Sequence, residues 1–103
     1  MVEEKKKMIE IVPFGIFQMV IGEDAMIVNY LIDVKIKNNC CYLNDVSLNK
    51  LINRLNEVNI DYFYNNELYN FNENKYDLYL KYSYKKKEID NKYLYDIKHI
   101  EDL

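Results

Sequence analysis

The clearest pattern along the chain is an apolar stripe at helical spacing in residues 45–58. Its apolar residues recur every three or four positions, and polar residues such as Asn49 and Arg54 lie between them. Asn44 or Asp45 can cap the start of this segment, because a short polar side chain accepts hydrogen bonds from the first backbone N–H groups of a helix. The pattern predicts one amphipathic helix that packs through Leu48, Leu51, Ile52, Leu55 and Val58.

The N-terminal third has the residue pattern of strands. Residues 8–21 are rich in β-branched and aromatic side chains, and they predict a strand that is apolar on both faces and bends near Pro13 and Gly15. After a predicted turn at 22–25, apolar and polar residues alternate through 26–37, which is typical of a half-buried strand. These two strands are expected to form an antiparallel hairpin. A turn at Asn38 and Asn39 and a short strand at 40–43 follow.

Tyrosine dominates the second half of the chain. Nine of the 11 tyrosines follow residue 60, and tyrosine has a high propensity for strands. Tyr76, Leu78, Leu80, Tyr82 and Tyr84 alternate with mostly polar neighbours, which predicts a strand with this set on its core face. The expected elements of this half are strands at 60–64, 76–84 and 93–100, a polar loop at 65–74 and a charged loop at 85–92.

Taken together, these elements predict an α+β fold with a mostly antiparallel sheet of five to six strands and one packed amphipathic helix. The length of 103 residues fits a single small domain over 1–103. The charged residues 1–7 are expected to be frayed.

Composition changes this picture mainly through charge. The net charge is −3, and nucleic-acid binders usually carry a positive surface, so this balance disfavours a nucleic-acid partner. Asn, Lys, Ile and Tyr are abundant while Ala, Arg, Pro and Gly are scarce. Codons of the first group are AT-rich, so an AT-rich genome accounts for part of the tyrosine excess.

The two cysteines indicate a reducing compartment. Cys40 and Cys41 are adjacent, and neighbours in a strand point to opposite faces, so neither a disulfide nor a shared metal is expected. Acidic residues and Pro13 interrupt the only segment that resembles a secretion signal. No apolar run approaches the roughly 20 residues that span a bilayer. The expected location is therefore cytoplasmic, without a membrane partner.

The residues that carry common chemistry are too few to predict an enzyme. His99 is the only histidine, so the chain has too few residues of the required types to predict a catalytic triad or a histidine-based metal site. Gly15 and Gly22 are the only glycines, and no phosphate-binding or dinucleotide-binding loop can be built from them. The carboxylates show no calcium-loop spacing. We expect no catalytic residues, no cofactor and no metal.

Protein binding is the function class that the tyrosines favour. Tyrosine buries a large area at low entropic cost, and one helix cannot cover all the aromatic residues of the second half. The expected partner-binding residues are Tyr64, Glu67, Tyr69, Tyr79 and Tyr93. If these do not carry the interface, the first hairpin is the next candidate.

In size and composition, the chain resembles two groups of small microbial inhibitors. One is the immunity proteins that neutralise a cognate toxin, and the other is phage or mobile-element inhibitors of host defence, such as anti-CRISPR proteins. The resemblance implies a non-enzymatic inhibitor whose partner is another protein, either a toxin or a nucleic-acid-handling enzyme. Charge complementarity to a basic groove would then involve Asp61, Glu67, Glu73 and Asp77.

Two alternatives remain open. One is a small nucleic-acid-binding β protein that stacks bases on Tyr79 and holds phosphates with Lys81 and Lys85–Lys87. The other is a homo-oligomeric structural or accessory subunit, for example a homodimer, joined through an exposed edge strand.

Overall fold

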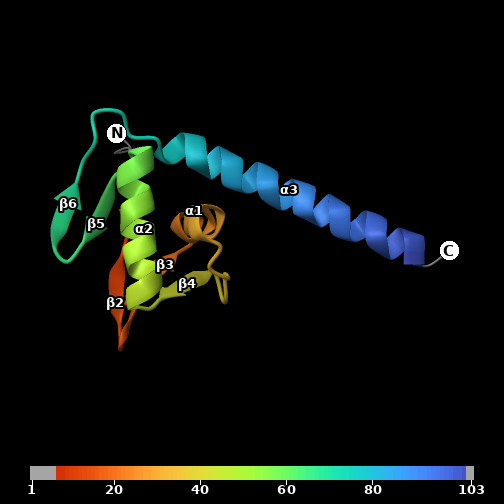
Figure 1. The fold of residues 1–103 in the computed structure, drawn as a ribbon, viewed down its shortest axis with the longest axis horizontal. Coiled ribbons are helices and arrows are strands. Elements are labelled where there is room, and N and C mark those ends of the chain that lie inside the picture. The colour runs from red at the N-terminus through yellow and green to blue at the C-terminus, as the bar shows by residue number, and fades with distance from the viewer. Residues whose placement is uncertain (1–6, 102–103) are drawn as a thin grey trace, which may run out of the picture.

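The fold is α+β, with three helices and two small sheets of three strands each (Figure 1). The computed structural model describes residues 7–101 and the side chains up to residue 92. In chain order the elements are β1 (Ile9–Glu10), β2 (Val12–Phe14), β3 (Phe17–Ile21), α1 (Glu23–Ile32), β4 (Cys40–Leu43), α2 (Asp45–Val58), β5 (Tyr62–Tyr64), β6 (Glu67–Tyr69) and α3 (Tyr76–Glu101).

The predicted single sheet of five to six strands is wrong. One sheet has the order β2-β3-β4 and is antiparallel throughout. The other has the order β1-β5-β6, in which β1 runs parallel to β5 and β5 antiparallel to β6. Only Ile11 separates β1 from β2, so the chain passes directly from one sheet into the other. Because the long segments expected to supply further strands are helical, the strands stay few and short.

The predicted helix at 45–58 is confirmed with the same bounds. Its start is capped by Asn44, whose side-chain oxygen accepts a 2.9 Å hydrogen bond from the backbone N–H of Ser47. It ends at Asn59 in the left-handed conformation, with φ at 63°. Of the predicted stripe, Leu48, Leu51 and Leu55 are buried, while Ile52 and Val58 are partly buried against the same core. The short strand at Cys40–Leu43 and the left-handed turn at Asn38 and Asn39 are also confirmed.

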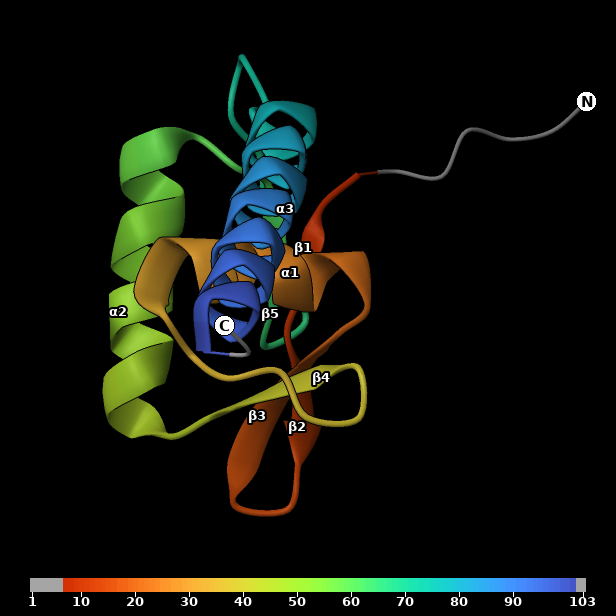
Figure 2. The ribbon, with the colours of Figure 1, turned by 90° about the vertical axis from the view of Figure 1, so that its right-hand side faces the viewer.

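Residues 26–32 of the predicted strand at 26–37 are instead part of helix α1, residues 33–37 follow the helix outside any named strand, and the predicted turn at 22–25 holds the first residues of α1. Residues 26–32 are apolar at almost every position, so they satisfy a strand period and a helix period equally well. A helix that is apolar all round is stable when other elements surround it. This is the case for α1, which contacts α2, α3, β3 and β4 (Figures 1 and 2).

The predicted strands at 76–84 and 93–100, and the charged loop between them, form the single helix α3. Its inward-facing residues are Tyr76, Tyr79, Leu80 and Ser83, which follow one another at helical spacing. The expected core face at every second position is therefore wrong, and Leu78, Tyr82 and Tyr84 are exposed. The alternation of tyrosine with polar residues suggested a strand, but packing against α1 selects the helix.

The N-terminal segment forms a hairpin with itself. Residues 8–21, expected as one bent strand, hold β1, β2 and β3, and the chain reverses at Gly15 and Ile16 between β2 and β3. The predicted fraying of residues 1–7 falls almost wholly outside the described residues. Lys7 is described, and its backbone carbonyl accepts a 2.7 Å hydrogen bond from the side-chain amide of Asn74.

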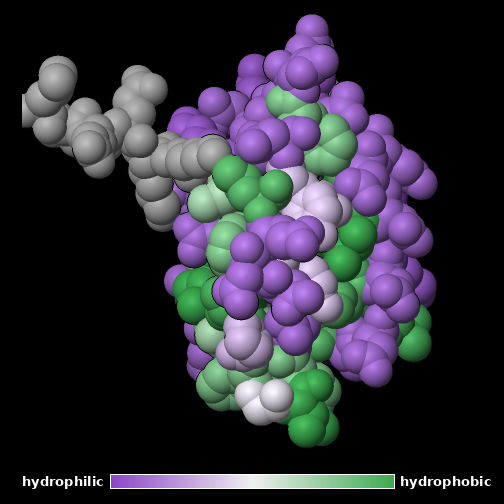
Figure 3. Space-filling model, turned by 90° about the vertical axis from the view of Figure 1, so that its left-hand side faces the viewer, coloured by the Kyte–Doolittle hydropathy of each residue, from purple (hydrophilic) through white to green (hydrophobic). Residues whose placement is uncertain are grey.

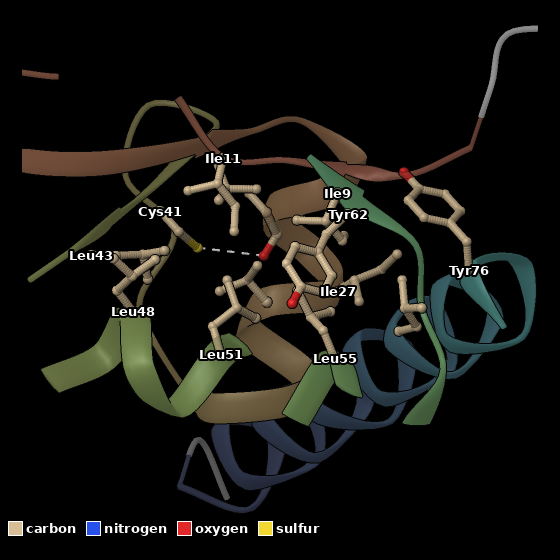
Figure 4. Close-up of a cluster of buried hydrophobic side chains, with 14 residues drawn as sticks. Ile9, Ile11, Ile27, Cys41, Leu43, Leu48, Leu51, Leu55, Tyr62 and Tyr76 are labelled. Carbon is tan, nitrogen blue, oxygen red and sulfur yellow. Dashed lines mark hydrogen bonds between the residues drawn. The ribbon is translucent and has the colours of Figure 1, made fainter. Parts of the chain in front are cut away.

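The core lies where α1, α2 and both sheets meet (Figure 4). Each element contributes apolar side chains, and Leu51 and Leu55 of α2 point toward Ile27 of α1. Beyond the core, the predicted strand at 60–64 is shorter, at Tyr62–Tyr64, and the predicted loop at 65–74 contains β6. The largest fully buried side chains are those of Ile9, Ile11, Ile27, Leu43, Leu51, Leu55, Ile60, Val20, Val28 and Cys41.

Candidate protein-binding surface

The β2–β3 hairpin closes through a two-residue turn. Phe14 pairs with Phe17 as the last residue pair, and Gly15 and Ile16 connect them. Gly15 has φ at +62°, a conformation that glycine adopts without strain and that favours glycine at the first position of a two-residue hairpin turn. Pro13 lacks an N–H group, and it lies on β2, the edge strand of its sheet, where this is tolerated.

The tip of this hairpin is apolar and faces solvent. Ile16 is 90% exposed, Phe14 is 53% exposed and Phe17 is 41% exposed. Figure 3 shows apolar side chains gathered at the lower end of one face of the molecule, where this hairpin lies. We refer to Phe14, Ile16 and Phe17 as the apolar tip.

The chain segment that contains the apolar tip is uncharged as well. No charged residue occurs in the sequence between Glu10 and Glu23. Phe14 also contacts the ring of Tyr42 on β4, with 5.6 Å between the ring centroids, so the apolar surface continues onto the neighbouring strands. Contiguous exposed apolar surface of this kind marks interaction sites in soluble proteins.

Three of the predicted partner-binding residues lie together in the β5–β6 hairpin. Tyr64 and Glu67 form the last residue pair before its turn, and Tyr69 pairs with Tyr62 further along. The Tyr69 hydroxyl donates a 2.9 Å hydrogen bond to the Glu67 carboxylate, which raises the pKa of the Tyr69 phenol. The ring of Tyr69 stacks on the buried Tyr62 at 4.6 Å between centroids. One face of Tyr69 is therefore already occupied, and Tyr64 is half-buried against the core.

The other two predicted residues lie on α3, separated from this hairpin in sequence and from each other in space. Tyr79 is partly buried and packs edge-on against Tyr30 of α1, with 6.0 Å between centroids. Tyr93 follows 14 residues later in the same helix, which places it roughly 21 Å further along the axis; its side chain lies outside the described residues. The five predicted residues thus do not form one continuous patch.

The four acidic residues expected at a basic groove differ in availability. Asp61 is buried, and its carboxylate accepts a 2.8 Å hydrogen bond from the backbone N–H of Phe71. Glu73 pairs with Lys75 at 2.9 Å, and Asp77 pairs with Lys7 at 2.7 Å. Only Glu67, Glu73 and Asp77 are on the surface, and each already has a partner within the chain.

The lysines of the nucleic-acid alternative are on a helix and not on a strand. Lys81 and Lys85–Lys87 belong to α3, and Lys86 lies over the ring of Tyr30 at 6.0 Å from its centroid. Tyr79, expected to stack on a base, packs inward against the core instead. The combination of an exposed aromatic residue and basic residues along one strand is therefore not formed here.

A hollow of about 500 Å³ lies between the start of α3 and the turn before α1. Tyr76 donates a hydrogen bond to the Asp24 carboxylate at its edge, and burial together with this carboxylate raises the pKa of the Tyr76 phenol. Glu10 and Lys7 are among the other lining residues. Among the described residues that line the hollow, none is a histidine, cysteine or serine.

The described part of the chain shows neither a cluster of metal-binding side chains nor a membrane-spanning helix. Among the described side chains, which end at residue 92, no three of His, Cys, Asp or Glu are grouped so as to hold a metal ion. Over residues 7–101, no helix has the length and apolar character needed to cross a membrane.

The two thiols differ in environment. Cys41 is fully buried and its thiol lies 3.4 Å from the carbonyl oxygen of Ala25, whereas Cys40 is partly exposed. Burial, with a smaller contribution from the adjacent Cys40, raises the pKa of the Cys41 thiol from 9.0 to about 11. Neither cysteine forms a disulfide in the structure.

Alkylation should therefore distinguish the two cysteines. At neutral pH, iodoacetamide is expected to modify Cys40 in the native protein and to leave Cys41 unmodified, because the thiolate is the reacting form and Cys41 is both protonated and inaccessible. In denaturant both should react. Peptide mass spectrometry without reductant measures this, and equal native rates at the two positions would contradict the described burial.

The apolar tip is not among the residues predicted to bind a partner. The hairpin expected as the next candidate, which pairs 8–21 with 26–37, is not formed, because residues 23–32 are helix α1. The sequence feature that indicates the β2–β3 hairpin is Gly15-Ile16 between two apolar segments. A two-residue connection that begins with glycine is typical of a hairpin turn. Such a turn places its second residue at the extreme end of the hairpin.

Comparison of this chain with protein-family models, with curated proteins and with solved structures finds no match.

Proposed function

We propose that this chain is a non-enzymatic protein-binding module that docks through the apolar tip of its β2–β3 hairpin. The observation that carries the proposal is the exposure of Ile16, 90%, between two exposed phenylalanines. Exposing such side chains to water is unfavourable, and the cost is recovered when a partner covers them. The tip reaches past the N-terminal end of α2, so an apolar pocket can receive it without contacting the rest of the fold (Figures 1 and 2).

Inhibition is the role we propose for this binding. The chain is small, acidic and lacks the residues of a recognisable active site, as do the toxin-immunity and anti-defence inhibitors that it resembles in size and composition. A projecting apolar hairpin supplies what such an inhibitor needs, which is a compact anchor that fills a pocket of the target. The target class proposed is a toxin or a nucleic-acid-handling enzyme. Glu67, Glu73 and Asp77 could assist at the rim only by giving up their present partners.

The β5–β6 hairpin is the second candidate surface. Leu68 and Tyr69 are both exposed there, next to Glu67. Its aromatic content favours binding, but the Tyr69 ring is partly covered by Tyr62 and its hydroxyl already has an acceptor. In the apolar tip, Ile16 is not covered by other residues of the chain in this way. We therefore rank the apolar tip first as a binding surface.

Affinity capture with three baits tests the proposal. The baits are the wild type, a tip variant (Phe14→Ser, Ile16→Ser, Phe17→Ser) and a β5–β6 variant (Leu68→Ser, Tyr69→Ser), each incubated with an extract of the source organism. We expect one prey protein to be retained by the wild type and the β5–β6 variant and to be lost by the tip variant. Circular dichroism of each bait controls for folding.

The reverse pattern would move the interface to the β5–β6 hairpin. A prey retained by all three folded baits would contradict both candidate surfaces. Nuclease treatment of the extract distinguishes the nucleic-acid alternative, because a prey bridged by nucleic acid is lost from every bait after treatment.

A further inference from the structure

The sheet β2-β3-β4 is apolar on both faces. Side chains alternate between the two faces of a strand, and paired residues of neighbouring strands share a face. Val20, Cys41 and Leu43 point to the inner face and are buried in the core. The opposite face, which we call the outer face, carries Val12, Phe14, Phe17, Met19, Ile21 and Tyr42.

The rings of Phe14 and Tyr42 show directly that the outer face is one surface. These residues lie on the two strands that flank β3, and their ring centroids are 5.6 Å apart, so the rings meet over the central strand. Four side chains of the outer face are exposed, among them Ile21 at 50%, and Val12 and Met19 are half-buried. None of the six is charged. An antiparallel sheet with one face in the core usually has a polar second face, so this composition indicates a surface that a partner covers.

The two edges of this sheet are poor templates for an added strand. Phe14 and Phe17 close a two-residue turn and form a hydrogen-bonded pair, so the backbone of Pro13 points away from β3, toward the free edge. Pro13 lacks the N–H donor that an added strand requires there. On β4, the backbone N–H and C=O groups of Cys40 are bonded to Lys37 at 3.0 and 2.8 Å. We therefore expect a partner to lie across the outer face and not beside an edge strand.

The end of the outer face away from the apolar tip is acidic. Val12 and Ile21 also line the hollow of about 500 Å³ near the start of α3, so the hollow opens at this end of the face. Glu10 and Glu23 line the hollow as well, and both are exposed. Neither forms an ion pair with a described residue, whereas Lys7, also in the lining, is already paired with a carboxylate. The face is therefore apolar along its length and negatively charged at one end.

We propose that the outer face binds an amphipathic helix of the partner protein. The apolar side of that helix lies along the sheet, and a lysine or arginine at one end of it enters the acidic hollow. Helix α1 of the chain itself packs on the inner face, and a helix on a sheet face is a common packing arrangement. From Phe17 to Ile21 the face is roughly 14 Å long, which matches about two and a half turns of helix.

Charge complementarity selects the basic end of the helix. A cation in the hollow is attracted by Glu10 and Glu23, while an acidic residue there is repelled. Basic surfaces are typical of nucleic-acid-handling proteins, one of the target classes proposed above. The inference rests on the proposed function, because it assigns the chemistry of the protein that the apolar tip engages.

A displayed peptide library tests this chemistry without the natural partner. The library contains peptides of about 18 residues, or about five helical turns, with one side and both ends randomised. The bait is the immobilised full chain. We expect the retained peptides to have apolar residues at helical spacing and a lysine or arginine at one end. Retention of no peptide, or of peptides without this pattern, would overturn the proposal.

Fluorescence anisotropy with one retained peptide then locates its contacts. Met19→Ser/Ile21→Ser should weaken binding by more than about tenfold, because it removes apolar contacts at the centre of the face. Glu10→Gln/Glu23→Gln should weaken binding by about threefold or more and should remove most of its dependence on salt. The matched control Glu57→Gln/Glu88→Gln removes two exposed carboxylates outside the outer face and should bind as the wild type does. Circular dichroism confirms that each variant folds.

An affinity that neither outer-face variant changes, or that the control reduces equally, would overturn the proposal. Sedimentation velocity tests the other occupant: a wild-type dimer that Met19→Ser/Ile21→Ser dissociates would assign the face to a second copy of the chain and overturn the proposal as well. The two proposals fail in different experiments. A prey retained by the tip variant contradicts the proposed function, whereas the absence of a basic, helical peptide pattern contradicts this inference.

Discussion

Leu51→Ala is expected to lower the free energy of unfolding by about 2–5 kcal/mol. Leu51 is fully buried at the middle of α2 and points into the core shared with α1 and both sheets (Figure 4). Truncation removes apolar contacts and leaves a cavity that the surrounding side chains fill only in part. Urea unfolding followed by circular dichroism, with wild type and variant at the same concentration, measures the change.

Val46→Ala in the same helix is the control, because Val46 is exposed and its truncation should change the stability by less than about half a kcal/mol. A loss of that small size at Leu51 would show that α2 does not anchor the core. Loss of cooperativity in the Leu51 variant would instead show that the core no longer holds the two sheets together.

Helix α2 could be predicted from sequence because two independent signals agree there. Asn44 supplies a cap, and the apolar stripe has a single period. Local preference and tertiary packing select the same structure, so the predicted bounds are those observed.

Helices α1 and α3 could not be predicted in the same way, for two different reasons. In α1 the near-continuous apolar run carries no period that separates strand from helix. In α3 the abundance of tyrosine and lysine creates an alternation, while the residues that pack inward, such as Leu80 and Ser83, have the spacing of a helix. Ser83 is polar and is buried with its hydroxyl bonded to the carbonyl of Leu80, so an apolar pattern cannot reveal it.

The prediction of strands in place of helix α3 also affected the predicted binding residues. The sequence pattern predicts Tyr79 and Tyr93 on strands of one sheet, but both lie in the single helix α3, 14 residues apart. Some of the tyrosine side chains cover one another within the chain and so do not need a partner protein to cover them. Tyr62 and Tyr69, for example, stack ring on ring. Exposed apolar residues are found at the hairpin tip, whose turn lies in a segment that the sequence pattern predicts as one bent strand.

Ile16→Asp is expected to have the largest effect on binding of any single substitution in the tip. The side chain is 90% exposed, so its replacement costs little folding stability, and Gly15 keeps the turn. In a complex the new carboxylate would be desolvated in an apolar pocket. Hot-spot positions of this kind contribute about 2 kcal/mol or more, which corresponds to a loss of affinity of about 30-fold or greater.

The most direct measurement is the dissociation constant of the captured partner for wild type, Ile16→Asp and Ile36→Asp, by titration calorimetry. Ile36 is also an exposed isoleucine, but it lies in the segment after α1, away from the hairpin. Docking through the apolar tip predicts a dissociation constant raised about 30-fold or more for Ile16→Asp and unchanged for Ile36→Asp. Equal dissociation constants for wild type and Ile16→Asp would contradict it.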